Sequence, residues 1–235
     1  MPYSYYYWGF DPTYILVLIG AVICLVASAR VKSTYNKYAS YRSMSGMTGA
    51  QAAERILHSA GIYDVSVQHV SGNLTDHYNP VNKTINLSRD VYYGNSIAAA
   101  AVAAHETGHA LQHAKGYSML KLRSTLVPAV EFASHWVQWI LLAGILMVNS
   151  FPGLLLVGIG LFAIMTLFSF VTLPVEIDAS HRALAWLRNS GITDYQTQGY
   201  AFDALKWAAY TYVIAALSSL ATLLYYIMIY LNRRD

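Results

Sequence analysis

Residues 105–109 read His-Glu-Thr-Gly-His, and their types and spacing suit hydrolysis by a metal-bound water. On an α-helix, residues four positions apart lie on one face and about 6 Å apart along the axis, so His105 and His109 can hold one ion. Glu106 follows the first histidine and is placed to take a proton from water on that ion. Two imidazoles and one oxygen ligand suit zinc, which keeps a fourth position open for water. The pentapeptide therefore predicts a site for one Zn²⁺ ion, with Glu106 as the catalytic base.

The third ligand must come from elsewhere in the chain. His113 continues the row of histidines but would lie about 12 Å along the helix from His105, too far to share the ion. Glu131 comes 22 positions after His109, within an apolar run and beside His135 at the fourth position after it. Glu131 is therefore a candidate ligand, with an intramembrane polar pair as its plainer role.

Glu176, 67 positions after His109, is the preferred third ligand. A membrane hairpin over 126–173 would return the chain to the side that it left, and so bring Glu176 to the side of the two histidines. Pro174 favours a helix start, which would put Glu176 in the first turn of that helix. Asp178 is a candidate for orienting a ligating histidine, with a structural cap as the alternative.

Attack of water on a peptide carbonyl creates an oxyanion, which needs a hydrogen-bond donor in addition to the metal. His181, Tyr210 and Tyr212 are candidates for this role. Tyr212 lies near the expected end of the last apolar run, where a tyrosine is also typical of a membrane–water boundary.

The elements that must position these groups are predicted from local signals. Ser96 caps a helix that carries the pentapeptide, and Thr48 caps an earlier helix with an apolar stripe. Residues 65–69 and 84–88 read as short strands, and residues 78–83 as a turn. The strand at 84–88 is either a sheet edge to which an extended peptide could add a strand, or an ordinary hairpin strand. These signals predict a small α+β, zincin-like insertion.

The composition places this insertion in a membrane protein. Of the 235 residues, 56% are apolar and only 11% are charged, against about 25% charged residues in a soluble domain. A net charge of +3 is too mild to indicate a nucleic-acid partner, and the single cysteine, Cys24, excludes a disulfide framework. Four runs have bilayer length: 13–29, 126–149, 153–173 and 207–231. The predicted fold class is mainly α, a multi-pass helical membrane protein with a small cytoplasmic α+β insertion.

The distribution of positive charge predicts the orientation. Thirteen of the fifteen Lys and Arg residues fall in segments 30–125 and 174–206. Because positively charged loops stay in the cytoplasm, the active site is expected on the cytoplasmic side of the cell membrane. Arg233 and Arg234 disagree, since four complete spans would leave them outside. The predicted parts are a signal-anchor span (1–29), a cytoplasmic segment with the zinc helix (30–125), a transmembrane hairpin (126–173), a cytoplasmic helix region with the third ligand (174–206), and a C-terminal span with its tail (207–235).

Several stretches beyond the pentapeptide resemble the YugP-like membrane zinc metallopeptidases of bacteria, and the similarity runs over nearly the whole chain. They are Asp76-His-Tyr-Asn-Pro, Leu87-Ser, Tyr92, Ser96-Ile-Ala-Ala, Ala104-His-Glu-Thr-Gly-His-Ala-Leu-Gln and Pro174-Val-Glu-Ile-Asp-Ala-Ser. The resemblance implies a bacterial membrane protein with zinc on His105, His109 and Glu176, and with Glu106 as catalytic acid and base. More distantly, the sequence is similar to membrane proteases related to the CAAX prenyl endopeptidase, which also take a glutamate from a later helix.

Two functions from different classes follow. The first is a zinc-dependent endopeptidase that hydrolyses peptides or membrane proteins near the cytoplasmic membrane surface, with the lipid bilayer and a peptide or protein substrate as its partners and a regulatory membrane partner left open. The alternative is a catalytically silent membrane scaffold or quality-control adaptor with a structural zinc site. Glu106 favours the enzyme, because a structural site has no use for a general base there.

Overall fold

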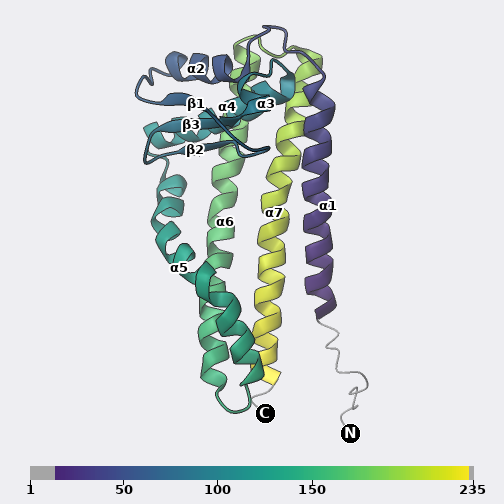
Figure 1. Ribbon diagram of the computed structural model, residues 1–235, viewed down its shortest axis with the longest axis vertical. Coiled ribbons are helices and arrows are strands. Elements are labelled where there is room, and N and C mark those ends of the chain that lie inside the picture. Colours follow the sequence, from purple (N-terminus) through teal and green to yellow (C-terminus); the bar gives the residue numbers. More distant parts are fainter. Residues whose placement is uncertain (1–13, 233–235) are drawn as a thin grey trace. The chain divides into compact units, whose positions relative to one another are not determined.

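The computed structural model describes residues 14–232, and in that part the chain forms seven helices and three strands. Arg233 and Arg234, whose side of the membrane was in question, lie outside the described residues. In chain order the elements are α1 (Tyr14–Ala39), α2 (Gly49–Ser59), β1 (Ser66–Val70), β2 (His77–Asn79), β3 (Thr84–Ser88), α3 (Arg89–Tyr92), α4 (Ile97–Ala114), α5 (Ser118–Leu146), α6 (Pro152–Asn189) and α7 (Tyr195–Asn232) (Figure 1).

Four of the described helices, α1, α5, α6 and α7, are long and apolar enough to cross a membrane. Helices α6 and α7 have 38 residues each, which corresponds to about 57 Å at 1.5 Å per residue. A bilayer core is only about 30 Å thick, so both helices extend well beyond it. The chain is a mainly α-helical membrane protein with a small α+β part, which confirms the predicted fold class.

The expected helix start at Pro174 is wrong, because Pro174 lies inside the continuous helix α6. Proline removes one backbone hydrogen-bond donor from a helix. The helix continues past Pro174 because every fourth side chain after it is buried, and this tertiary packing stabilises the helical conformation. These residues are Val175, Ala179, Ala183 and Leu187, all at most 1% exposed. Glu176 therefore projects from the middle of a long helix, where its backbone is fixed by a full turn on either side.

The described chain divides into two compact units. Within the described residues, the first comprises 14–26, 126–170 and 213–232, and the second comprises 27–125 and 171–212. In the first unit, α5 and α6 approach closely at Gly144, since a Cβ there would lie 2.6 Å from the Cα of Leu155. Its buried core includes Val137, Leu141, Val148, Leu155 and Ile159.

The second unit is built around α4, which is covered on two sides by separate apolar clusters. One cluster joins its small residues to α2, α6 and α7 and includes Ile56, Ala101, Ala104, Leu187 and Leu205. The other joins it to α2, α3 and the sheet and includes Leu57, Ile85, Leu87, Val91 and Ala103. The Ser96 hydroxyl caps the helix by accepting from the Ala99 amide at 3.1 Å, as expected. The alanine-rich first half of α4 lets these neighbours pack close to its axis.

The three-stranded sheet has the order β1-β3-β2, with β1 parallel and β2 antiparallel to β3 (Figure 1). All five residues of β3 are buried. The suggestion that this strand forms a sheet edge is therefore wrong, because β1 and β2 occupy the two edges. Strand β2 covers 77–79 and so takes two residues from the segment that was expected to be a turn.

Candidate metal centre

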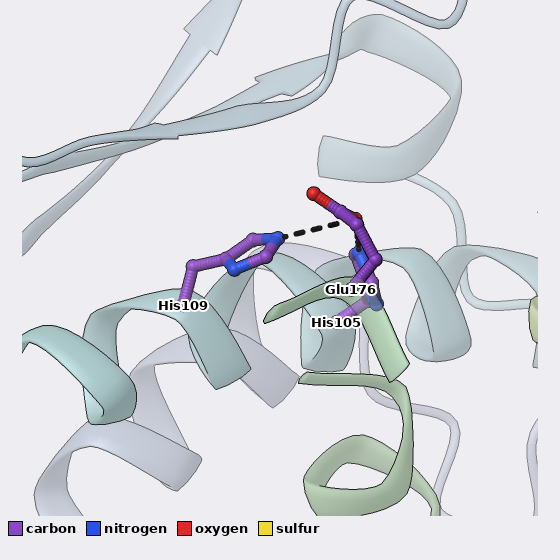
Figure 2. Close-up of side chains that lie close together, drawn as sticks. All are labelled: His105, His109 and Glu176. Carbon is purple, nitrogen blue, oxygen red and sulfur yellow. Dashed lines mark hydrogen bonds and ion pairs between the residues drawn. The ribbon is translucent and has the colours of Figure 1, made fainter. Parts of the chain in front are cut away.

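Two helices of the second unit bring three ligand groups together. Helix α4 presents His105 and His109 one turn apart, and α6 presents Glu176 (Figure 2). The Nε2 atoms of His105 and His109 lie 3.2 and 3.6 Å from the same Glu176 oxygen, Oε2. The side chain of Glu176 is only 3% exposed. Within the part of the chain that the structure describes, His105, His109 and Glu176 each offer one potential metal-ligand atom, and these atoms all lie within 4.8 Å of one another.

This donor set fits zinc. Ligands at about 2.1 Å in a tetrahedron are separated by about 3.4 Å from each other, and the two Nε2–Oε2 distances, 3.2 and 3.6 Å, lie on either side of that value. Two imidazoles and one carboxylate also leave the fourth tetrahedral position free for water. His105, His109 and Glu176 can therefore hold a zinc ion without a change of fold.

The two helices can approach this closely because residue 108 is glycine. A Cβ on Gly108 would lie 2.8 Å from the carbonyl oxygen and 3.2 Å from the Cα of Ala179. Gly108 is the residue before His109, and Ala179 lies three positions after Glu176. The glycine of the pentapeptide thus lets the backbone of α6 pass directly over α4, next to the ligand groups.

Each histidine is held through its other ring nitrogen. Nδ1 of His105 lies 3.1 Å from Oγ of Ser180, and Nδ1 of His109 lies 3.0 Å from Oε1 of Gln112. These contacts turn both Nε2 atoms toward Glu176. Hydrogen bonds behind metal-binding histidines fix the ring orientation and the tautomer.

The second oxygen of Glu176 has its own partners. Nη1 of Arg123 donates to Oε1 of Glu176 at 3.3 Å, and the hydroxyl of Tyr212 also interacts with this carboxylate. Glu176 is thereby approached from α4, α5 and α7. These contacts leave its carboxylate little freedom to rotate.

Glu106 lies beside the ligand group and is itself only 8% exposed. Its charge acts on His109, on Tyr212 and on Asp76. Asp76 accepts hydrogen bonds from the amide and the hydroxyl of Ser88 at 2.7 and 3.0 Å. Burial raises the pKa of Asp76, the Ser88 hydrogen bonds oppose that rise, and the nearby Glu106 charge adds to it, with a raised pKa as the result. The site is therefore rich in carboxylates for its degree of burial.

The negative charges of the site also affect the pKa of His109. Burial lowers the pKa of this imidazole, but its contact with Glu176 and the charges of Glu106 and Glu176 outweigh burial, so the pKa of His109 is raised. A pocket that stabilises the positive form of a buried histidine also favours a bound cation. The electrostatics thus agree with the fit of the ligand atoms.

The other predicted site residues are placed differently. Asp178 does not contact a histidine directly but accepts from Nε2 of Gln112 at 2.7 Å. His181 is exposed on α6, and Tyr210 is 44% exposed and packs its ring against Trp207. Glu131 belongs to the first unit and is not a member of the three-residue ligand group.

The sequence interpretation missed the roles of Gln112, Ser180 and Arg123. A signal existed for Gln112, which stands three positions after His109 and therefore on the same helix face. Ser180 likewise stands four positions after Glu176. Arg123 could not be found in this way, because it reaches the site from a different helix.

Comparison with known proteins places the chain in a family. The chain belongs to the family described as "Putative neutral zinc metallopeptidase", whose sequence pattern matches residues 13–231. It is 45% identical over 211 residues to the protein named "Putative membrane protease YugP" of Bacillus subtilis (strain 168), an alignment that covers 89% of this chain and 92% of that protein. These findings confirm the resemblance stated from the motifs. No solved structure matches the chain.

Proposed function

We propose that this protein is a zinc-dependent endopeptidase of the membrane, with His105, His109 and Glu176 as zinc ligands and Glu106 as general base. The observation that supports it best is the convergence of two Nε2 atoms on one buried carboxylate oxygen, at 3.2 and 3.6 Å, with Glu106 next to the first histidine. Family membership and the similarity to a protein named a membrane protease support the same reaction class.

Zinc bound to these ligands would polarise the scissile carbonyl and lower the pKa of its water ligand toward about 7. Glu106 takes the proton of the attacking water and delivers it to the leaving nitrogen. The near-complete burial of Glu106 keeps competing water away from that proton path. Tyr212, whose hydroxyl already reaches Glu176, is the preferred donor to the oxyanion.

The substrate is expected to bind in an extended form. An edge strand offers unpaired backbone groups to a peptide that adds to the sheet. Because β3 is central, β2 is the edge that suits this role: it packs against the helix that carries the histidines. The charge of Glu106 also acts on Asp76, the residue directly before β2. A peptide paired with β2 would thus pass close to the general base.

We also propose that the catalytic segments 30–125 and 174–206 lie on the cytoplasmic side of a bacterial cell membrane. The helix pair formed within 126–173 and the terminal parts 1–29 and 207–235 would anchor them. Substrates would then be peptides or membrane-protein segments near the cytoplasmic surface. The support for this orientation is the concentration of thirteen of fifteen Lys and Arg residues in the two catalytic segments.

Replacing Glu106 with Gln tests the enzyme against a structural zinc scaffold. The amide keeps the size of the side chain but cannot accept the water proton, so we expect full zinc content and a loss of peptide cleavage of about 100- to 10,000-fold. Zinc would be measured by elemental analysis of the purified protein, and cleavage with a peptide library. Glu54→Gln, an exposed change on α2, is the matched control. Equal cleavage by wild type and Glu106→Gln would contradict the proposed role, and a wild type that holds zinc but cleaves nothing would favour the scaffold.

A further inference from the structure

The side-chain amide of Gln112 has only one orientation that satisfies its neighbours. Its Nε2 atom lies 2.8 Å from the carbonyl oxygen of Val175 and 2.7 Å from Oδ2 of Asp178. A backbone carbonyl can only accept hydrogen bonds. The group that faces both must therefore be the NH₂ of the amide, and its oxygen must point the other way.

That oxygen points at His109. Oε1 of Gln112 lies 3.0 Å from Nδ1 of His109, and an amide oxygen can only accept. Nδ1 must then carry a hydrogen. In the neutral ring this leaves Nε2, the atom that faces Glu176, with its lone pair free to bind a metal.

The position of Asp178, whose carboxylate accepts from Gln112, is also fixed. Asp178 is held by Arg182 through two hydrogen bonds, from Nε at 2.6 Å and from Nη2 at 3.2 Å. Both hydrogen bonds are donated by the guanidinium, so the two oxygens of Asp178 serve as acceptors. Gln112 itself is fully buried, so water does not compete for its amide. Nδ1 of His109 therefore donates to Gln112, the NH₂ of Gln112 donates to Asp178, and Arg182 donates to the same carboxylate.

His105 is supported differently. Its Nδ1 contacts the hydroxyl of Ser180, and a hydroxyl can rotate to donate or to accept. Ser180 therefore accommodates either tautomer of His105. Of the two Nδ1 contacts, the one at His109 therefore fixes which atom donates, whereas the one at His105 does not.

We infer that Gln112 is a positioning residue: its NH₂ group donates to Val175 and Asp178, so its oxygen accepts from Nδ1 of His109 and presets the tautomer of that histidine that can bind a metal through Nε2. Asp178 on α6 and His109 on α4 are connected through the side chain of Gln112, which forms a hydrogen bond with each of them. The inference rests on the proposed zinc site and adds to it a residue that acts only through His109.

The first test is the zinc affinity of Gln112→Met, a change that keeps the length of the side chain and removes both ends of the amide. Loss of a hydrogen-bond partner behind a metal ligand typically lowers affinity about 10- to 100-fold, and we expect the zinc dissociation constant to rise by that factor. It would be measured on the full-length, detergent-solubilised protein by competition with a chromophoric chelator. Gln198→Met is the matched control, because Gln198 also bonds a backbone carbonyl, that of Leu184, but lies outside the site.

An unchanged zinc affinity in Gln112→Met, with a wild type that binds zinc normally, would overturn the inference and leave the proposed function intact. A wild type that fails to bind zinc would instead refute the proposed function. An equal loss in Gln198→Met would reduce the role of Gln112 to general packing and would also overturn the inference.

A second measurement needs no Gln112 variant and so does not depend on its folding. Nitrogen-15 NMR of histidine-labelled, zinc-loaded wild type, with the His109 signals assigned through a His109→Ala sample, reports which ring nitrogen holds the metal. We expect zinc on Nε2 and a slowly exchanging proton on Nδ1 of His109. Zinc on Nδ1, or an Nδ1 without a proton, would contradict the assigned polarity.

Discussion

Glu176 is the residue on which the interactions of the site converge. One of its oxygens faces both histidines and the other accepts from Arg123. Removing this carboxylate would leave a guanidinium beside two imidazoles without their common acceptor, which disfavours a bound cation as well as removing a ligand. The contribution of Glu176 to a metal site is thus electrostatic and geometric together.

Metal content should separate Glu176 from Glu131, the other glutamate considered as a ligand. We expect Glu176→Ala to lose zinc at micromolar free metal, because two histidines alone do not complete the three protein ligands of a catalytic site. Glu131→Ala should keep full occupancy, since Glu131 is not among the three groups that lie within 4.8 Å of one another. Elemental analysis of both variants after dialysis against the same buffer measures the difference. Full occupancy in Glu176→Ala would disprove its role as a ligand.

At the residue scale, the sequence could predict those site residues whose positions follow from helix spacing or from the order of the membrane spans. His105 and His109 follow from helix spacing, Glu106 from the motif that they frame, and Glu176 from counting membrane crossings. The structure brings donor atoms of His105, His109 and Glu176 within 4.8 Å of one another. The roles of Gln112 and Arg123 depend on which helices pack together, and that information is absent from any single stretch of sequence. The hydroxyl of Ser180 was overlooked although its spacing from Glu176 was available.

At the scale of elements, the site depends on how closely α6 crosses α4. The backbone of α6 contacts α4 at Gly108, where a Cβ would lie only 2.8 Å from the carbonyl oxygen of Ala179. Sequence patterns identified α4 and its Ser96 cap because both are local. They failed at Pro174, where tertiary packing of Val175 and Ala179 overrides the usual effect of proline, and at β2, whose three residues gain stability only from pairing with β3.

Gly108→Ala should therefore harm the site more than an ordinary helix substitution. The added methyl would stand 2.8 Å from the Ala179 oxygen, and relieving such overpacking typically costs about 1–3 kcal/mol. We expect a lower melting temperature and weaker zinc binding, because α4 must move away from the helix that carries Glu176. Thermal unfolding in detergent and chelator competition measure the two effects.

Gly199→Ala provides the control for that substitution. A Cβ at Gly199 meets no atom within 4 Å, and alanine is favoured over glycine in a helix by up to about 1 kcal/mol. Its melting temperature should stay the same or rise. If both variants behave alike, the close approach at Gly108 is not what holds the two ligand helices together.

At the scale of the whole molecule, charge and hydrophobicity are separated along the chain. Of the 27 formally charged residues, 22 fall in segments 30–125 and 174–206. The second compact unit, 27–125 and 171–212, contains both segments entirely. The low average charge of the chain therefore reflects the rest of the sequence, which holds only 5 of the 27 charged residues. Composition alone could identify the membrane class, but not which side the polar unit faces.

Cysteine labelling decides that side. In a Cys24→Ala background, Thr75→Cys places a thiol at an exposed position just before β2, and Ser150→Cys places one at the exposed turn between α5 and α6. If the segment that contains Thr75 lies in the cytoplasm, as we propose from its positive charge, a membrane-impermeant maleimide should label Ser150→Cys in intact spheroplasts. Thr75→Cys should react only after the membrane is permeabilised. The reverse labelling pattern would place the proposed zinc site outside the cytoplasm, and its substrates would then lie outside as well. Labelling of both positions from outside would mean that α5 does not cross the membrane, and the transmembrane hairpin itself would then have to be abandoned.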